Sequence, residues 1–188
     1  MSGGKPPASP PPFRERLRWD AASGEIRDGE VRYLMLRHDA LMGMFRAMAP
    51  EHRGPALLAL ADSITHHGGQ SARKYQAMEA ADGARLLAVI AATAPQLGWG
   101  LWEVVDPGPG LVRIRVRNSP FAVGWRDNGL PRADTEGVTS VCAAIVGMLR
   151  VVGQMVAGGP VQALEAQCAC EAHHADCVFE IRPITSKA

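Results

Sequence analysis

The chain has 188 residues, of which 47% are hydrophobic and 21% charged, and its formal net charge is +1. This length suits one domain with tails, and the near-neutral charge argues against a protein that binds nucleic acid or an anionic membrane surface. Four cysteines are too few for a disulfide scaffold. No apolar stretch is long and uncharged enough to predict a transmembrane helix. We therefore expect a cytoplasmic protein with reduced thiols, in which clustered cysteines indicate metal ligands or reactive groups.

The N-terminal part of the chain is predicted to be a tail followed by short strands. Residues 1–12 hold five of the 14 prolines and no large apolar residue, which is typical of a disordered tail and not of a signal peptide. Residues 13–36 are expected to form short extended pieces, because Ser23-Gly24 and Asp28-Gly29 separate them with typical turn pairs.

Helices are expected next. Residues 39–48 place apolar side chains at helical spacing, and we expect Pro50 to stop this helix. Further helices are predicted over 54–80 and 82–94. In the first of these, Gly68-Gly69 is expected either to kink the helix or to let another backbone approach closely.

The pattern then changes to a period of two. Residues 99–105 and 112–116 flank the Pro- and Gly-rich turn 106–110, which predicts a β-hairpin. Residues 118–136, with two prolines and two glycines, are expected to be a loop.

The C-terminal part is expected to hold the core helix and the last strands. Residues 137–157 are apolar around most of a helix circumference, which predicts a central core helix. Strands are predicted over 161–168 and 177–181. The order of these elements indicates an α+β fold in which an antiparallel sheet packs with helices on one side.

The residues with the most distinctive chemistry lie near the end of the sequence. They are Glu165, Cys168, Cys170, His173, His174 and Cys177, with Cys142 upstream on the expected core helix. Zinc prefers thiolate and imidazole ligands, and a carboxylate can complete a closed tetrahedral site. From spacing alone, three interpretations stay open: a zinc site made of cysteines and a glutamate, a reactive thiol, or unrelated cysteines. Two adjacent histidines on a turn are more typical of solvated side chains than of ligands.

The ending of the chain resembles a known closing motif. Glu165-x2-Cys168, followed by Cys177-Val178-Phe179-Glu180-Ile181, resembles the end of the 4-vinyl reductase domain family, and Cys142 has the place of an earlier cysteine of that family. The N-terminal part resembles the sensory domains of aromatic-responsive activators of the XylR/DmpR type. The segments that carry this second resemblance are Leu17-Arg18-Trp19, Val31-Arg32, Gly69-Gln70-Ser71, Pro95-Gln96-Leu97 and Asn118-Ser119-Pro120-Phe121.

The resemblance covers residues 13–183 and implies one ligand-binding domain followed by a short tail, 184–188. It implies the fold shared by nitric-oxide-signalling domains and a Golgi-transport subunit, and a homodimer formed through the N-terminal segment 13–48. It also implies a zinc ion held by Cys142, Glu165, Cys168 and Cys177. Because Cys168 and Cys177 are one residue further apart than is usual in the family, either Cys170 replaces Cys168 or a bulge absorbs the extra residue.

The resemblance further implies a small aromatic ligand in a buried pocket above the zinc. Gly98 stands where phenol-responsive relatives have a histidine, so the partner for a phenol hydroxyl is missing here. The candidate ligand-binding residues are Tyr75, Trp99, Trp102, Phe121, Trp125 and Met148, with His67 as a polar anchor.

We therefore expect a free-standing small-molecule-binding sensor or regulatory domain with a structural zinc site. An alternative is an accessory protein of tetrapyrrole (bacteriochlorophyll) biosynthesis or a pigment carrier. A third is an assembly module that uses the fold for dimerisation. No nucleotide, flavin or hydrolase motif appears in the sequence, so we assign no catalytic residues and expect binding rather than catalysis.

Overall fold

The computed structural model describes residues 11–79, 83–108, 110–132 and 140–184. The body of the protein is built on a four-stranded sheet with the strand order β4-β5-β7-β6, and every neighbouring pair is antiparallel. Its strands are β4 (Leu101–Gly108), β5 (Leu111–Arg117), β6 (Val161–Gln167) and β7 (Cys177–Pro183). The predicted hairpin and the two predicted C-terminal strands are confirmed.

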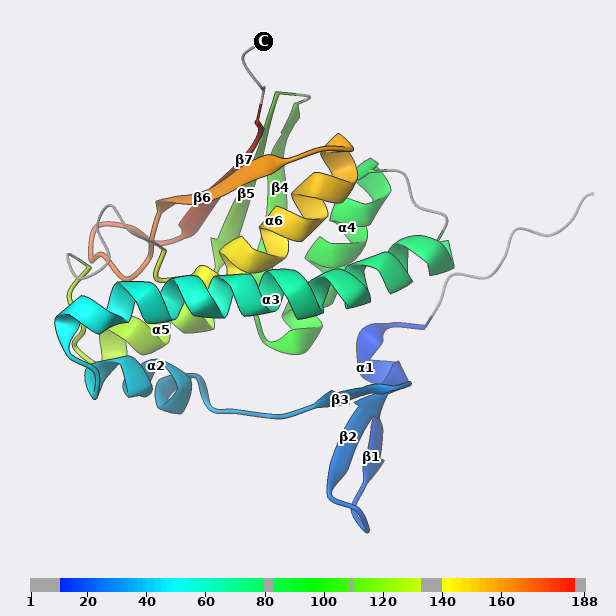
Figure 1. Cartoon of the computed structure of the whole chain (residues 1–188), viewed down its shortest axis with the longest axis horizontal. Coiled ribbons are helices and arrows are strands. Elements are labelled where there is room, and N and C mark those ends of the chain that lie inside the picture. The colour runs from blue at the N-terminus through cyan, green and yellow to red at the C-terminus, as the bar shows by residue number, and fades with distance from the viewer. Residues whose placement is uncertain (1–10, 80–82, 109, 133–139, 185–188) are drawn as a thin grey trace, which may run out of the picture.

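Helices cover one face of this sheet, which confirms the predicted α+β class (Figure 1). The central helix α6 packs against β6 and β7, and α3 packs against α6. The other sheet face is polar, because Arg115 and Arg117 alternate along β5 with the buried Ile114 and Val116. The helices of the body are α2 (His38–Arg46), α3 (Pro50–Glu79), α4 (Gly83–Thr93), α5 (Pro120–Asp127) and α6 (Ala143–Ala157).

The crossing of α3 and α6 depends on glycine. An added Cβ at Gly147 would lie 2.3 Å from the carbonyl oxygen of Ala61, so a larger residue would force the two backbones apart. An added Cβ at Gly68 would lie 2.8 Å from Cε of Met148. The helix α3 runs unbroken through Gly68-Gly69, and these two glycines face the side chains of Met148 and Val151 instead of another backbone; the close backbone approach is at Gly147.

Three element predictions were wrong in detail. The predicted loop 118–136 contains α5, because Ser119 caps it by accepting a hydrogen bond from the backbone N–H of Ala122, and Pro120 occupies its first turn. The helix predicted over 137–157 begins only at Ala143, and 133–139 lie outside the described residues. Pro50 opens α3 instead of stopping α2, because a first-turn proline loses no intrahelical hydrogen bond.

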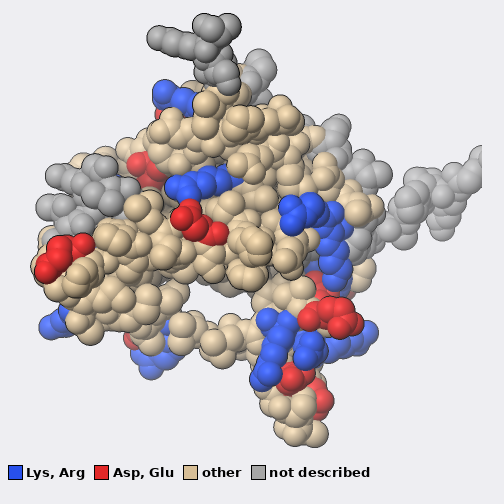
Figure 2. Space-filling model, viewed as in Figure 1, with Lys and Arg blue, Asp and Glu red and all other residues tan. Residues whose placement is uncertain are grey.

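The N-terminal segment contains short strands joined by turns at Gly24 and Gly29, as predicted, and these strands form a separate three-stranded antiparallel sheet. Gly24 and Gly29 occupy the turns with φ of +68° and +60°, a region that favours glycine. The elements are α1 (Phe13–Arg16), β1 (Arg18–Asp20), β2 (Glu25–Asp28) and β3 (Val31–Tyr33). This small sheet projects from the helical body, and Figure 2 shows an opening between the body and the stretch that leads from β3 to α2.

The helices of the described residues include none that is both long enough and apolar enough to cross a bilayer. The predicted N-terminal tail lies mostly outside the described residues, as do residue 82, where a helix was predicted to begin, and residues 185–188.

Candidate metal centre

The four side chains predicted as metal ligands come together at one end of the sheet. Cys142, Glu165, Cys168 and Cys177 each offer one ligand atom, and these four atoms all lie within 4.8 Å of one another. The three cysteines are at most 1% exposed. The group can hold a metal ion.

Three elements position these side chains. Cys142 is the N-cap residue of α6, whereas the sequence placed it within the helix. Cys177 opens β7, and Glu165 lies near the end of β6. Residues three apart point to opposite faces of a regular strand, so Glu165 and Cys168 could not both face α6 without an irregularity. A register shift between Glu165 and Gln167 supplies it, because a bulge adds one residue and reverses the alternation.

The distances between the sulfur atoms suit a metal centre. The Sγ atoms of Cys142 and Cys177 are 3.8 Å apart, far longer than the about 2.05 Å of a disulfide bond. A tetrahedral zinc ion with Zn–S bonds of about 2.3 Å would separate two sulfurs by about 3.8 Å. All four cysteines are free thiols.

Hydrogen bonds hold the ligand atoms in place. The hydroxyl of Ser140 donates to Oε2 of Glu165 at 2.6 Å, and the backbone N–H of Ala169 donates to Sγ of Cys177 at 3.3 Å. The hydroxyl of Ser119 lies 3.2 Å from Sγ of Cys142, so the cap of α5 also supports this sulfur.

One oxygen of the group is left without a partner. Oε1 of Glu165 is buried, and no group among the described residues forms a hydrogen bond with it. Burying an unsatisfied carboxylate oxygen is unfavourable, by about 1–3 kcal/mol or more. A cation held between this oxygen and the three sulfurs would satisfy it, so the donor set fits a metal ion.

Protonation of the cluster would be coupled to metal binding. Burial raises the pKa of the Cys142 thiol and of the Glu165 carboxyl. Hydrogen bonds from the thiols of Cys142 and Cys168 lower the pKa of Cys177 well below its ordinary value, and the bond to Cys142 in turn raises the pKa of Cys168. Metal binding would therefore displace protons from the ligands whose pKa is raised.

Cys170, the predicted substitute for Cys168, lies outside this group of ligand atoms. It is half-buried, and a hydrogen bond from Cys168 lowers the pKa of its thiol. The structure thus places Cys168, and not Cys170, beside the other three predicted ligands.

An apolar pocket of about 480 Å³ lies between the N-terminal segment and the body. Two predicted ligand-binding residues line it, Trp99 and Phe121, whose rings meet edge to face with centroids 5.4 Å apart. One wall of the pocket, formed by residues 34–36 and by Leu60 and Ile64 of α3, was not predicted from the sequence. The apolar run Leu34-Met35-Leu36, which continues beyond the end of β3 at Tyr33, was the sequence signal that could have indicated this wall.

The other predicted ligand-binding residues lie elsewhere. Trp102 and Trp125 belong to the core, where their indole N–H groups donate to the carbonyls of Trp99 and Pro131. Met148 packs in the crossing of α3 and α6, and His67 is exposed on α3. The side chain of Tyr75 lies outside what the structure describes.

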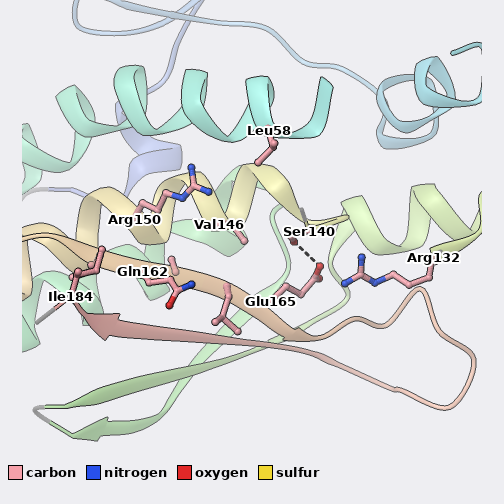
Figure 3. A pocket seen from close by; sticks show the side chains of 11 residues that line it. Leu58, Arg132, Ser140, Val146, Arg150, Gln162, Glu165 and Ile184 are labelled. Carbon is pink, nitrogen blue, oxygen red and sulfur yellow. Dashed lines mark hydrogen bonds between the residues drawn. The ribbon is translucent and has the colours of Figure 1, made fainter. Parts of the chain in front are cut away.

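A larger, polar groove of about 760 Å³ runs along the edge strand β6 and was not predicted (Figure 3). Arg132, Arg150, Gln162 and Glu165 line it. Figure 3 shows Arg132 reaching toward Glu165, and Arg150 forms an ion pair of 2.9 Å with Asp62. Glu165 therefore lies between the cysteine cluster and this groove.

The sequence matches no protein-family model and no curated protein, so the resemblance to the 4-vinyl reductase family stays a prediction. Among solved structures, the fold is similar to the crystal structure of the phenol-responsive sensory domain of the transcription activator PoxR with phenol. The TM-score is 0.74, and the match covers 90% of this chain and 85% of that chain at 18% sequence identity. At this identity the likeness establishes the fold alone. The chain thus has the fold of a sensory domain of a transcription activator.

Proposed function

We propose that the chain is a small-molecule-binding regulatory domain with a structural zinc ion held by Cys142, Glu165, Cys168 and Cys177. The observation that carries this proposal is the fold shared with a phenol-responsive sensory domain over nearly the whole of both chains. The buried donor set and the apolar pocket support it independently.

Zinc is proposed because of the chemistry of its ligands. Thiolates select soft or borderline ions, and three thiolates with one carboxylate suit zinc in tetrahedral geometry. Four protein ligands leave no open position for water, so the ion would fix the end of the sheet and would not catalyse a reaction. Ser119, Ser140 and the N–H of Ala169 would orient the ligand atoms, as hydrogen-bonded neighbours of metal ligands commonly do.

The proposed ligand is a small apolar aromatic molecule in the pocket beside Trp99 and Phe121. Its volume falls in the usual range for small-molecule sites, and most of its lining is apolar. Both ends of the Gln96 side chain are already engaged: Oε1 accepts from the backbone N–H of Arg14, and Nε2 donates to the carbonyl of Ala92. Gly98 has no side chain to offer. We therefore expect toluene to bind more tightly than phenol.

The N-terminal segment 13–48 is proposed as the dimer interface. Its exposed apolar side chains include Trp19 at 65%, Leu34 at 84% and Met35 at 72% exposure. Contiguous apolar surface of this kind is typical of an interaction site. Because these three residues also line the apolar pocket, a bound ligand would contact the same segment that pairs two copies.

Thermal denaturation with toluene and with phenol tests the ligand proposal. At ten times its dissociation constant, toluene should stabilise the protein by about 1.4 kcal/mol and raise the Tm by about 4 °C. Trp99→Ala should abolish this shift. Leu101→Ala, which truncates an exposed side chain of β4 outside the pocket, should retain it. The ligand proposal is wrong if neither compound raises the Tm, or if both variants respond alike.

A further inference from the structure

We propose that Glu171, His173 and His174 form a second metal site, which binds an exchangeable divalent transition-metal ion such as zinc or nickel at the protein surface. The three residues lie in the connection between β6 and β7. Their ligand atoms all lie within 4.8 Å of one another, and the group shares no residue with the buried cysteine cluster.

The distances fit one ion. Oε2 of Glu171 is 3.2 Å from Nε2 of His174 and 3.6 Å from Nε2 of His173. An ion bound by nitrogen and oxygen at about 2.0–2.1 Å in tetrahedral geometry would separate its ligand atoms by about 3.3–3.4 Å. Small side-chain movements would therefore close the site.

The backbone arranges these side chains in advance. The N–H of His174 donates to the carbonyl of Glu171 at 3.0 Å, which closes a turn and brings the first and last of the four residues together. The N–H of Glu171 donates in turn to the carbonyl of Cys168 at 3.2 Å. This backbone hydrogen bond would thus connect the proposed site to Cys168, a predicted ligand of the buried cluster.

The chemistry and the exposure of the group determine the kind of ion. Two imidazoles and one carboxylate suit zinc, nickel or cobalt, and they would leave the remaining coordination positions to water. The side chain of His173 is 72% exposed, and those of Glu171 and His174 are 30% and 26% exposed. An ion at this place would exchange with solution readily, unlike one enclosed by three buried thiols.

Glu171 also connects the proposed site to the polar groove. Its Oε1 lies 3.8 Å from Nε of Arg132, a residue that lines the groove beside Glu165. An ion on Oε2 would draw charge from this carboxylate and weaken its hold on Arg132. Metal binding at the surface would therefore change the ion pair of Arg132 at the side of the groove next to the buried cluster.

The chain contains a natural control. His66 and His67 are also adjacent and exposed, with ring centroids 4.8 Å apart. Among the described residues, this pair joins no group of three potential ligands. If adjacent histidines alone were sufficient for binding, the two pairs would behave alike.

The test is calorimetric titration of nickel chloride into the full chain, prepared without a histidine tag and with its resident metal content measured first. We expect one nickel ion to bind per chain in addition to any resident ion. His173→Ala/His174→Ala and Glu171→Gln should each weaken this binding about 10-fold or more. His66→Ala/His67→Ala should leave it unchanged.

A second measurement does not depend on the variants. In the wild-type protein, nickel should broaden the imidazole proton resonances of His173 and His174 before those of His66 and His67. The proposal is overturned if the wild type binds no additional ion, if the His66/His67 variant loses binding as strongly, or if the resonances of His66 and His67 broaden first.

Discussion

The two ends of this molecule differ in which side chains they bury and which they expose to solvent. At the β6–β7 end, three thiols are enclosed by the protein beside a carboxylate that also lines the polar groove, and Cys142 and Cys177 are 0% exposed. At the N-terminal segment, apolar side chains face outward, with Leu34 at 84% exposure. Buried polar groups need a partner within the fold, whereas exposed apolar groups gain from a partner outside it. The first end is therefore suited to an ion, and the second is the end that we propose to pair with another copy of the chain.

The largest effect should come from removing one ligand of the enclosed end. Cys177→Ser should abolish metal binding at the cysteine cluster and lower the free energy of unfolding by about 4 kcal/mol or more, because the remaining ligands of the cluster lose the ion that they share. Urea denaturation and metal analysis of the same samples measure both effects.

Cys170→Ser is the matched control for that substitution. Cys170 lies outside the group of ligand atoms, so metal content should stay at the wild-type value and stability should fall by about 1 kcal/mol or less. Loss of metal in this variant alone would reassign the ligand set to Cys170.

The helix crossing behind the enclosed end should be the next most sensitive feature. Gly147→Ala should destabilise the protein by about 3 kcal/mol, because the new Cβ would meet the Ala61 carbonyl. At Gly159 an added Cβ meets no atom within 4 Å, so Gly159→Ala should change stability by about 0.5 kcal/mol or less. Similar unfolding midpoints for the two variants would show that the helices do not cross this closely.

Substitutions in the N-terminal segment should mainly affect the association of two chains. Leu34→Ser/Met35→Ser should convert the proposed dimer to a monomer, because both side chains face outward and would pack against the second copy. Light scattering over a concentration series measures the association. Leu101→Ser, which alters an exposed side chain on β4, should remain dimeric; a wild-type monomer would refute the interface.

The smallest expected effect concerns the polar face of the sheet. A hydrogen bond from Arg113 lowers the pKa of Glu180 below its ordinary value of 4.5. A lowered folded-state pKa stabilises the protein above the unfolded pKa, and this contribution is lost as the pH falls through the folded value. Glu180→Gln should therefore reduce stability slightly at pH 7 and leave it unchanged near pH 2. Equal differences in the urea midpoint at both pH values would contradict this.

Much of the fold could be predicted from local patterns in the sequence. The turn at 106–110 and the alternation along 112–116 were sufficient to predict the β4–β5 hairpin, and Asp28-Gly29 predicted a tight turn in the N-terminal sheet. The α5 helix was missed because Pro120 and Gly124 are typical of loops. The Ser119 cap and the burial of Phe121 and Trp125 stabilise the helix. This burial depends on tertiary contacts, which local sequence patterns do not reveal.

The residues of the candidate metal site could be predicted from the sequence, but their arrangement in space could not. The spacing of Cys142, Glu165, Cys168 and Cys177, read together with a family resemblance, selected the four side chains that the structure brings together. It could not predict the bulge in β6, since register shifts depend on pairing with β7. Of the aromatic residues predicted to bind a ligand, some line the pocket and others pack in the core. Sequence periodicity predicts that a ring is buried, but it does not predict whether the ring borders a cavity. Trp99 lines the pocket and Trp125 does not.

The central claim is that this fold encloses one zinc ion with three sulfur ligands. The most direct measurement is X-ray absorption at the zinc edge on protein dialysed against a chelator to remove weakly held surface ions, with metal counted by native mass spectrometry. We expect one zinc per chain, three sulfur neighbours at about 2.3 Å and one oxygen at about 2.0 Å. A folded protein without metal, or a zinc ion with no sulfur neighbours, would contradict the account.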